Sequence, residues 1–364
     1  MRTRSFRFFY CLLLSSFLLS GFAKAAVGVF PDSVFNNLDY GLYWFGVGDN
    51  WQKAVPGQSN AYYNASKPTV IYIHGWQNGS TQAKNRETFY RYAAGGPDLD
   101  LAQSWLAAGY NVGSLYWNQF ADESEVKDAE AKIWSATGPK AMRWRKTDGT
   151  YATGPTVSAG ELLFRAYRDN LAGYTGSNIR LLGHSLGNQM AIVIAKKVSD
   201  AVSAGTMNSR LLPKRVALLD PFYSNYAKRY LNNQWTGAVC RTYVSELKTK
   251  GLIFEAYRTS AVTSTIFVGD ANTGLMNMTA YTELKPWYFS STQQTEKHNA
   301  AVWHYLWSFS YAPPVLTGTT TQGASASTSD ARITTLMNGT QKLVHDQGTS
   351  TKEPYDDTFK AAAR

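Results

Sequence analysis

The sequence predicts an α/β domain in which helices cover both faces of a mostly parallel central sheet. Two observations predict this. Short apolar runs bounded by glycine, proline or polar residues alternate with segments in which apolar residues recur at helical spacing. The runs are also nearly continuous in apolar character, which is typical of strands buried on both faces. We therefore expect a single domain over residues 26–312, a length that suits one α/β domain.

The expected elements follow from these two patterns. The expected strands are Thr69–Ile73, Asn111–Trp117, Asn178–Leu182, Arg215–Leu219 and Leu252–Ala256. The expected helices are Asp98–Ala108, Ala159–Ala172, Leu186–Val202 and Lys297–Phe309. Pro313 and Pro314 end the last of these helices, and the segment "TGTTTQGASASTSDA" that follows is polar and of low complexity. Residues 313–364 are therefore expected to form a flexible C-terminal tail or a poorly packed appendage.

The first 25 residues have the features of a secretory signal peptide. Arg2, Arg4 and Arg7 precede an apolar run from Phe8 to Leu19, and "AKA" at residues 23–25 predicts cleavage before Ala26. The apolar run is shorter than the ~20 residues that a membrane-spanning helix needs. We expect an exported chain, periplasmic or secreted, with no transmembrane segment after cleavage.

Charge and cysteine content exclude several classes of function. Cleavage would remove four basic residues and no acidic one, which lowers the formal net charge from +10 to +6 without leaving a dense basic block. No nucleic-acid motif is present, so we expect no nucleic-acid partner. Cys11 would leave with the signal peptide and Cys240 would remain alone, which excludes a disulfide within the chain. No metal cluster, phosphate loop or dinucleotide fingerprint occurs, so no metal or cofactor is expected. The oligomeric state stays open.

Ser185 is the candidate nucleophile. It lies in Gly183-His184-Ser185-Leu186-Gly187, after an expected strand and before a helix with apolar positions at Leu186, Met190, Ile194 and Val198. Glycines two residues before and after the serine let strand and helix approach closely and hold the serine in a strained turn. The turn would present the hydroxyl at the carboxyl end of the strand.

A serine hydroxyl needs a base, and the chain has only five histidines. His184 adjoins the serine and should point elsewhere, while His74 ends a strand and His345 lies in the expected tail. His298 and His304 remain, and His298 lies at the start of the last expected helix. We therefore choose His298 as the base and expect His304 to be a packed side chain.

Two aspartates could orient the base, and the residues alone leave both open. Asp220 follows the strand "RVALL", and Asp270 ends the apolar run "TIFVG". Either one gives the chain order Ser, Asp, His. An oxyanion site is expected from His74-Gly75-Trp76, which follows a buried strand, together with the N–H of Leu186.

Taken together, these segments resemble the pancreatic-lipase-type branch of the α/β-hydrolases. The resemblance rests on "VIYIHGW", "YNVGSLYW", "IRLLGHSLGNQMA", "RVALLDPFY" and "HNAAVWHYLWSF", spread over residues 69–310. It implies an α/β-hydrolase fold and a catalytic triad of Ser185, Asp220 and His298, with Trp76 and Leu186 as the oxyanion donors. It favours Asp220 over Asp270. Tyr116 stands where the family usually has an aspartate, and the disulfide-closed lid of the family has no counterpart.

The function that the resemblance implies is that of a secreted serine lipase or esterase. It would hydrolyse the carboxylic esters of acylglycerols at a lipid–water interface through an acyl-enzyme. Two alternatives stay open: a phospholipase A1-type enzyme or other esterase, and a non-catalytic lipid-binding protein on the same fold. Residues 118–155 and 260–297 are insertions that could cover the site.

Overall fold

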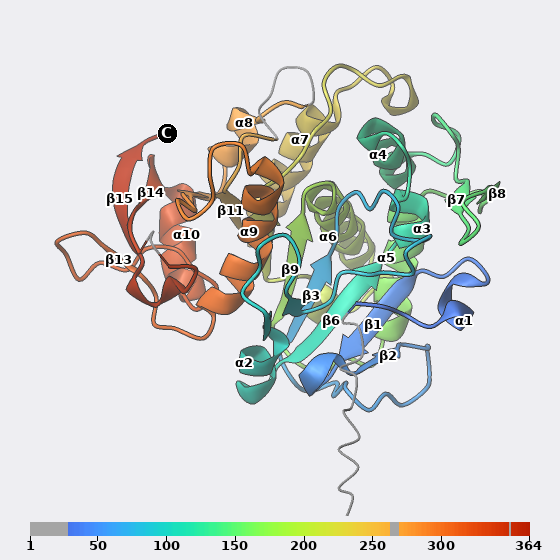
Figure 1. Ribbon diagram of the computed structural model, residues 1–364, viewed down its shortest axis with the longest axis horizontal. Coiled ribbons are helices and arrows are strands. Elements are labelled where there is room, and N and C mark those ends of the chain that lie inside the picture. Colours follow the sequence, from blue (N-terminus) through green and yellow to red (C-terminus); the bar gives the residue numbers. More distant parts are fainter. Residues whose placement is uncertain (1–27, 263–268, 349–350) are drawn as a thin grey trace, which may run out of the picture.

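A computed structural model of the chain describes residues 28–262, 269–348 and 351–364 (Figure 1). The expected signal peptide, residues 1–25, lies outside these ranges. Within them, no helix is both long and apolar enough to cross a membrane.

The central feature of the described residues is a sheet of eleven strands in the order β13-β15-β14-β12-β11-β10-β9-β3-β6-β1-β2. The strands from β6 to β14 are parallel to their neighbours, while β1 is antiparallel to β6 and β2, and β15 is antiparallel to β14. The strands are β1 (Gly41–Phe45), β2 (Trp51–Lys53), β3 (Thr69–Ile73), β6 (Asn111–Tyr116), β9 (Ile179–His184), β10 (Arg215–Leu219), β11 (Ile253–Arg258), β12 (Ala280–Glu283), β13 (Val315–Leu316), β14 (Gln341–Gln347) and β15 (Thr358–Ala363). Two small ribbons lie apart, β4 (Tyr90–Arg91) with β5 (Leu99–Asp100) and β7 (Trp144–Arg145) with β8 (Tyr151–Ala152).

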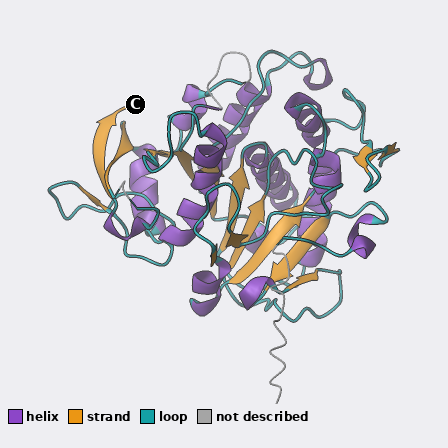
Figure 2. Cartoon of the chain, viewed as in Figure 1, coloured by secondary structure: helices purple, strands orange, loops and turns teal. Residues whose placement is uncertain are grey.

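Helices cover both faces of this sheet, which confirms the expected fold class (Figure 2). On one face α5 (Ala159–Asn170), α6 (Gly187–Ser203) and α7 (Thr236–Thr249) lie side by side, and on the other lie α2 (Ala102–Ala107) and α9 (Gln294–Ser308). The other helices are α1 (Asp32–Phe35), α3 (Asn118–Ala121), α4 (Val126–Trp134), α8 (Thr273–Met276) and α10 (Asp330–Asn338).

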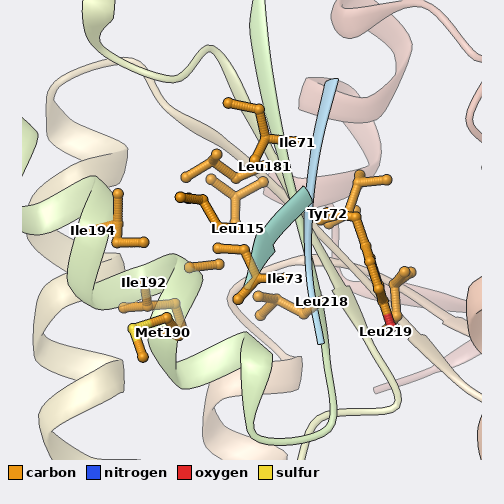
Figure 3. Close-up of a cluster of buried hydrophobic side chains, with 14 of the residues drawn as sticks. Ile71, Tyr72, Ile73, Leu115, Leu181, Met190, Ile192, Ile194, Leu218 and Leu219 are labelled. Carbon is orange, nitrogen blue, oxygen red and sulfur yellow. The ribbon is translucent and has the colours of Figure 1, made fainter. Parts of the chain in front are cut away.

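A large part of the core lies between α6 and the middle strands (Figure 3). The stripe expected on this helix, Leu186, Met190, Ile194 and Val198, is buried. Met190 and Ile194 lie beside strand side chains such as Ile73. Burial of one such side chain stabilises the fold by about 1.5–3 kcal/mol, so this stripe holds α6 firmly against the sheet.

The strand order places a topological switch point at the carboxyl ends of β3 and β9, which are neighbours. The chain leaves β3 towards β6 on one side, whereas it leaves β9 towards β10 on the other. Ligands of open α/β sheets bind where the connections diverge in this way. The expected nucleophile segment lies at this point.

The expectation of a flexible tail over residues 313–364 is wrong for the described part of that segment. It contains α10, β13, β14 and β15, and β14 pairs with β12 to extend the central sheet. The polar segment is ordered because its backbone carbonyls accept hydrogen bonds from two buried arginines. Arg215 donates to the carbonyls of Thr328 (2.7 Å) and Ser325 (2.8 Å), and Arg180 donates to that of Ala326 (2.8 Å). The composition of the segment could not predict these contacts. The acceptors are backbone carbonyl oxygens, which every residue carries whatever its side chain.

Removing residues 313–364 is therefore expected to destabilise the domain strongly. Arg215 would keep its ion pair with Glu255 but lose two carbonyl acceptors while remaining in the core. Each hydrogen bond to a charged group contributes roughly 1.5–3 kcal/mol, so a loss of at least about 3 kcal/mol in the free energy of unfolding is expected. Urea unfolding of the two chains measures it, and equal midpoints would contradict this account.

Candidate active site

Ser185 occupies a strained turn between β9 and α6. Its φ is 54°, in the left-handed region that non-glycine residues rarely adopt, and it is 8% exposed. The flanking glycines are required by close packing. A Cβ on Gly183 would lie 2.4 Å from the carbonyl oxygen of Gly187, and one on Gly187 would lie 2.1 Å from that of Ile73. The turn expected from the sequence is therefore present.

The loop after β3 packs directly against this turn. A Cβ on Gly75 would lie 2.7 Å from the Cβ of Ser185 and 3.3 Å from the backbone nitrogen of Leu186. Within the described residues, the N–H groups of Trp76 and Leu186 donate to no protein acceptor. Two unused N–H groups near the serine are what an oxyanion site requires.

The side chain of His74 links the loop after β3 to Trp117 through hydrogen bonds. Its ring bonds the carbonyl of Gly75 through Nδ1 (2.9 Å) and accepts the Trp117 N–H at Nε2 (3.1 Å). The indole of Trp117 donates in turn to the carbonyl of His74 (2.9 Å). Burial lowers the pKa of His74 to about 4, so the ring is neutral at neutral pH and can both donate and accept. We assign His74 a structural role.

His298 and Asp220 form a hydrogen-bonded pair. The Nδ1 of His298, in the first turns of α9, lies 2.6 Å from Oδ2 of Asp220, which follows β10. The ring of His298 packs 4.4 Å, centroid to centroid, from that of His184, the residue before Ser185. The fold thus brings the three residues predicted from the sequence to the same edge of the sheet.

The carboxylate of Asp220 is buried and held by two residues that the sequence analysis did not identify. Oδ1 accepts the N–H of Thr259 (3.1 Å), and Oδ2 accepts the hydroxyl of Ser260. Burial alone would raise the pKa of Asp220, but hydrogen bonds from His298, Ser260 and Thr259 outweigh it and lower the pKa. Their position in the sequence could have identified these two residues. Thr259 and Ser260 directly follow β11, which lies beside β10, so they are at the same edge of the sheet as Asp220.

Asp270 takes no part in this arrangement. Its side chain accepts the N–H of Asn272 (2.6 Å), two residues further on, and the residue is exposed. Such a local turn contact is the ordinary role of an aspartate in a loop.

The other histidines have partners of their own. His184 bonds the carbonyl of His298 through Nε2 (3.1 Å) and thereby ties the start of α9 to the serine turn. His304 (2.7 Å) and His345 (2.9 Å) both bind the carboxylate of Asp357. The packed role expected for His304 agrees with its burial.

The hydroxyl of Ser185 makes no hydrogen bond with any described residue, nor does Nε2 of His298. Hydrogen bonds between nucleophile and base are often long in unliganded sites and tighten when substrate binds. The arrangement offers a hydroxyl on a strained turn, an imidazole bound to a carboxylate, and two unused N–H groups.

The insertion 118–155 contacts the site's edge through ordered elements. It contains α3, α4, β7 and β8, and the buried Glu123 pairs with Lys132 (2.7 Å) and Arg143 (2.5 Å) inside it. The indole of Trp76 donates to the carbonyl of Glu123 (2.6 Å), which joins the loop after β3 to this insertion. Of the second insertion, 260–297, residues 263–268 lie outside the described ranges.

The strand order, the serine turn between β9 and α6, and the divergence of the connections after β3 and β9 define an α/β-hydrolase fold. No family model matches the sequence, and no curated protein matches it.

Several solved structures with distant similarity to this chain are esterases. Esterase 2 of Thermogutta terrifontis, a Planctomycetes species, bound to butyrate, is 11% identical over 77% of this chain and 93% of that chain, with a TM-score of 0.35. The same esterase phosphoramylated by tabun is 10% identical over 73% and 89%, with a TM-score of 0.34. A carboxylesterase of Lactobacillus plantarum is 11% identical over 68% and 82%, with a TM-score of 0.29. These similarities are too distant to assign an activity, and the pancreatic-lipase-type branch stays a prediction from the sequence.

Replacing Ser260 with alanine is expected to weaken the pH dependence of stability. The pKa of Asp220 is lower in the folded protein than in the unfolded chain, so its ionisation stabilises the fold above about pH 4. That contribution is lost as the pH falls through the folded pKa. Ser260→Ala removes one donor and raises the folded pKa, so the gain in stability from pH 3 to pH 7 should shrink, by at most about 1 kcal/mol.

Urea unfolding at pH 3 and pH 7 measures this difference. Ser290→Ala is the control, because among the described residues the Ser290 hydroxyl bonds only that of Thr292, on the surface. If both variants keep the pH dependence of the parent, Ser260 does not support the carboxylate.

Proposed function

We propose that the protein is an exported serine hydrolase that cleaves carboxylic esters of lipids, with Ser185, His298 and Asp220 as its catalytic triad. The observation that carries the proposal is the 2.6 Å hydrogen bond between His298 and Asp220 at the edge of the sheet where Ser185 occupies its strained turn. A buried aspartate bound to histidine Nδ1 leaves Nε2 free to accept a proton.

In the proposed reaction, the hydroxyl oxygen of Ser185 attacks the ester carbonyl and its proton passes to Nε2 of His298. The N–H groups of Trp76 and Leu186 bind the oxyanion that forms. Collapse of this intermediate expels the alcohol, which takes the proton from His298, and leaves an acyl group on Ser185. Water then loses a proton to His298 and attacks the acyl-enzyme. The second intermediate collapses, the bond between the acyl carbon and the Ser185 oxygen breaks, and His298 returns the proton to that oxygen as the acid leaves.

The charges around His298 support this proton transfer. Asp220 is ionised at neutral pH because its pKa is lowered, so it stabilises the imidazolium during the reaction. Burial, with a smaller contribution from His298, lowers the pKa of His184 to about 3. The ring that packs against His298 is therefore neutral and does not repel the positive charge that forms there.

Acylglycerols are the proposed substrates, and the resemblance noted in the sequence supports this choice. Trp76 at the oxyanion loop is 37% exposed, and Tyr226, six residues after Asp220, is 83% exposed. The partly exposed indole of Trp76, in the loop that packs against Ser185, suits contact with an apolar acyl chain. Export is proposed from the sequence alone, and N-terminal sequencing of the mature chain should begin at Ala26.

Substrate profiling tests this proposal. The mature protein should release fatty acid from emulsified tributyrin and longer triacylglycerols, and Ser185→Ala should not. Faster turnover of phosphatidylcholine than of triacylglycerol would favour the phospholipase alternative. Binding of lipid without turnover of any ester would contradict the hydrolase and favour a lipid-binding protein.

A further inference from the structure

Two strained turns lie side by side at the edge of the sheet. Ser185 follows β9 with φ of 54°, and Asp220 follows β10 with φ of 42°. The two strands are parallel neighbours, and their last residues, His184 and Leu219, lie opposite each other. The two turns therefore begin side by side at the carboxyl edge of the sheet. Neither conformation is favoured by its own residue, so the surrounding structure must maintain both.

The side chain of Asn188 bridges these turns. It lies in the first turn of α6 and is fully buried. Its Nδ2 donates to the carbonyl of Ser185 (2.9 Å) and to that of Leu219 (3.1 Å), the residue before Asp220. An amide nitrogen carries two hydrogens, so both are used. The reverse orientation would place Oδ1 against two carbonyl oxygens and is therefore excluded.

We infer that Asn188 is a positioning residue that clamps the turn of Ser185 to the turn of Asp220. The clamp rests on geometry alone, whereas its effect on the reaction rests on the proposed function. No catalytic contact is involved, because the amide reaches backbone carbonyls only.

Satisfying these carbonyls does not require the side chain of Asn188. The Ser185 carbonyl also accepts the N–H groups of Asn188 (3.2 Å) and Phe222 (3.3 Å), and the Leu219 carbonyl also accepts the N–H of Ser185 (3.1 Å). Moreover, Oδ1 of Asn188 is buried without a partner among the described residues, which lowers stability. A leucine of similar size would avoid this defect. Stability alone therefore does not favour asparagine here, whereas alignment of the two turns does.

The variant Asn188→Leu separates these roles. We expect its melting temperature to stay within a few degrees of the parent while kcat for ester hydrolysis falls about 10- to 100-fold, because errors near 1 Å in a catalytic geometry have effects of this size. KM should stay within about twofold, since no substrate contact is lost. Asn188→Ala is the second variant if leucine does not fit.

Asn111→Leu is the matched control. Asn111 is also buried, and its amide joins the carbonyl of Asn64 (2.8 Å) to the hydroxyl of Thr69 (3.0 Å) at the amino end of the sheet. It should lose stability but keep kcat. If Asn188→Leu and Asn188→Ala keep the parent's kcat, or if kcat falls as much in Asn111→Leu, the inference is overturned.

Amide hydrogen exchange tests the clamp without relying on catalysis. The N–H groups of Ser185 and Phe222 should exchange at least about tenfold faster in Asn188→Leu than in the parent, with the amides of β3 unchanged. Unchanged exchange at both positions would overturn the clamp. Failure of the parent to react with a fluorophosphonate would instead count against the proposed function, and the exchange comparison would still decide the inference.

Discussion

Replacing Asp220 with asparagine is expected to lower kcat for ester hydrolysis by about 10⁴-fold. An amide can present its NH₂ group to Nδ1 of His298, which moves the ring proton to Nε2. The base then carries a proton where it must accept one. The carboxylate is fully buried, so no solvent ion can take its place. Initial rates on a soluble short-chain ester measure the effect.

Asp270→Asn is the matched control for this change. Asp270 was the other candidate acid, and its side chain contacts only the N–H of Asn272 in the described structure. Its kcat should stay within about twofold of the parent. A large loss in Asp270→Asn with near-normal activity in Asp220→Asn would reverse the assignment of the acid.

Replacing Gly187 with alanine is expected to have the largest effect on folding. The added carbon would lie 2.1 Å from the carbonyl oxygen of Ile73 and 2.8 Å from that of His74. Backbone on both sides would have to move, which separates α6 from β3 and opens the core in Figure 3. We expect a loss of more than about 3 kcal/mol in the free energy of unfolding, in the range of severe core changes.

Gly173→Ala distinguishes this clash from a general effect of replacing glycine. A Cβ on Gly173 would meet nothing within 4 Å, and the residue has no positive φ. This variant should match or slightly exceed the parent's stability, because alanine has less freedom to lose on folding. Equal stability of Gly187→Ala and Gly173→Ala would contradict the packing described for the serine turn.

The middle of the fold could be predicted because its residues have strong local signals. Expected strands Thr69–Ile73 and Arg215–Leu219 coincide with β3 and β10, and the other three expected strands overlap β6, β9 and β11. Buried parallel strands are continuous apolar runs, and the glycines around Ser185 leave few alternatives to a tight turn. The edge strands were not predicted. For example, β14 alternates between buried and less buried residues and lies in a polar context.

The supporting contacts of the site could not be predicted in the same way. Ser260 reaches Asp220 from the loop that follows the neighbouring strand β11, 40 residues away in sequence. Asn188 looks like any polar residue on a helix until the strand register brings Leu219 beside Ser185. The prediction of a flexible C-terminal segment was wrong for a related reason. The segment is held in an ordered structure by arginines of β9 and β10 that donate hydrogen bonds to its backbone carbonyls. These contacts depend on tertiary structure, which composition and periodicity do not encode.

The central claim is that Ser185 is an activated nucleophile. The most direct measurement is the reaction of the mature protein with a fluorophosphonate probe, followed by peptide mass spectrometry, with Ser185→Ala alongside. We expect one adduct on Ser185 that is absent from the variant. A folded parent that stays unlabelled, also in the presence of detergent micelles, would contradict the claim, as would an adduct on a different serine.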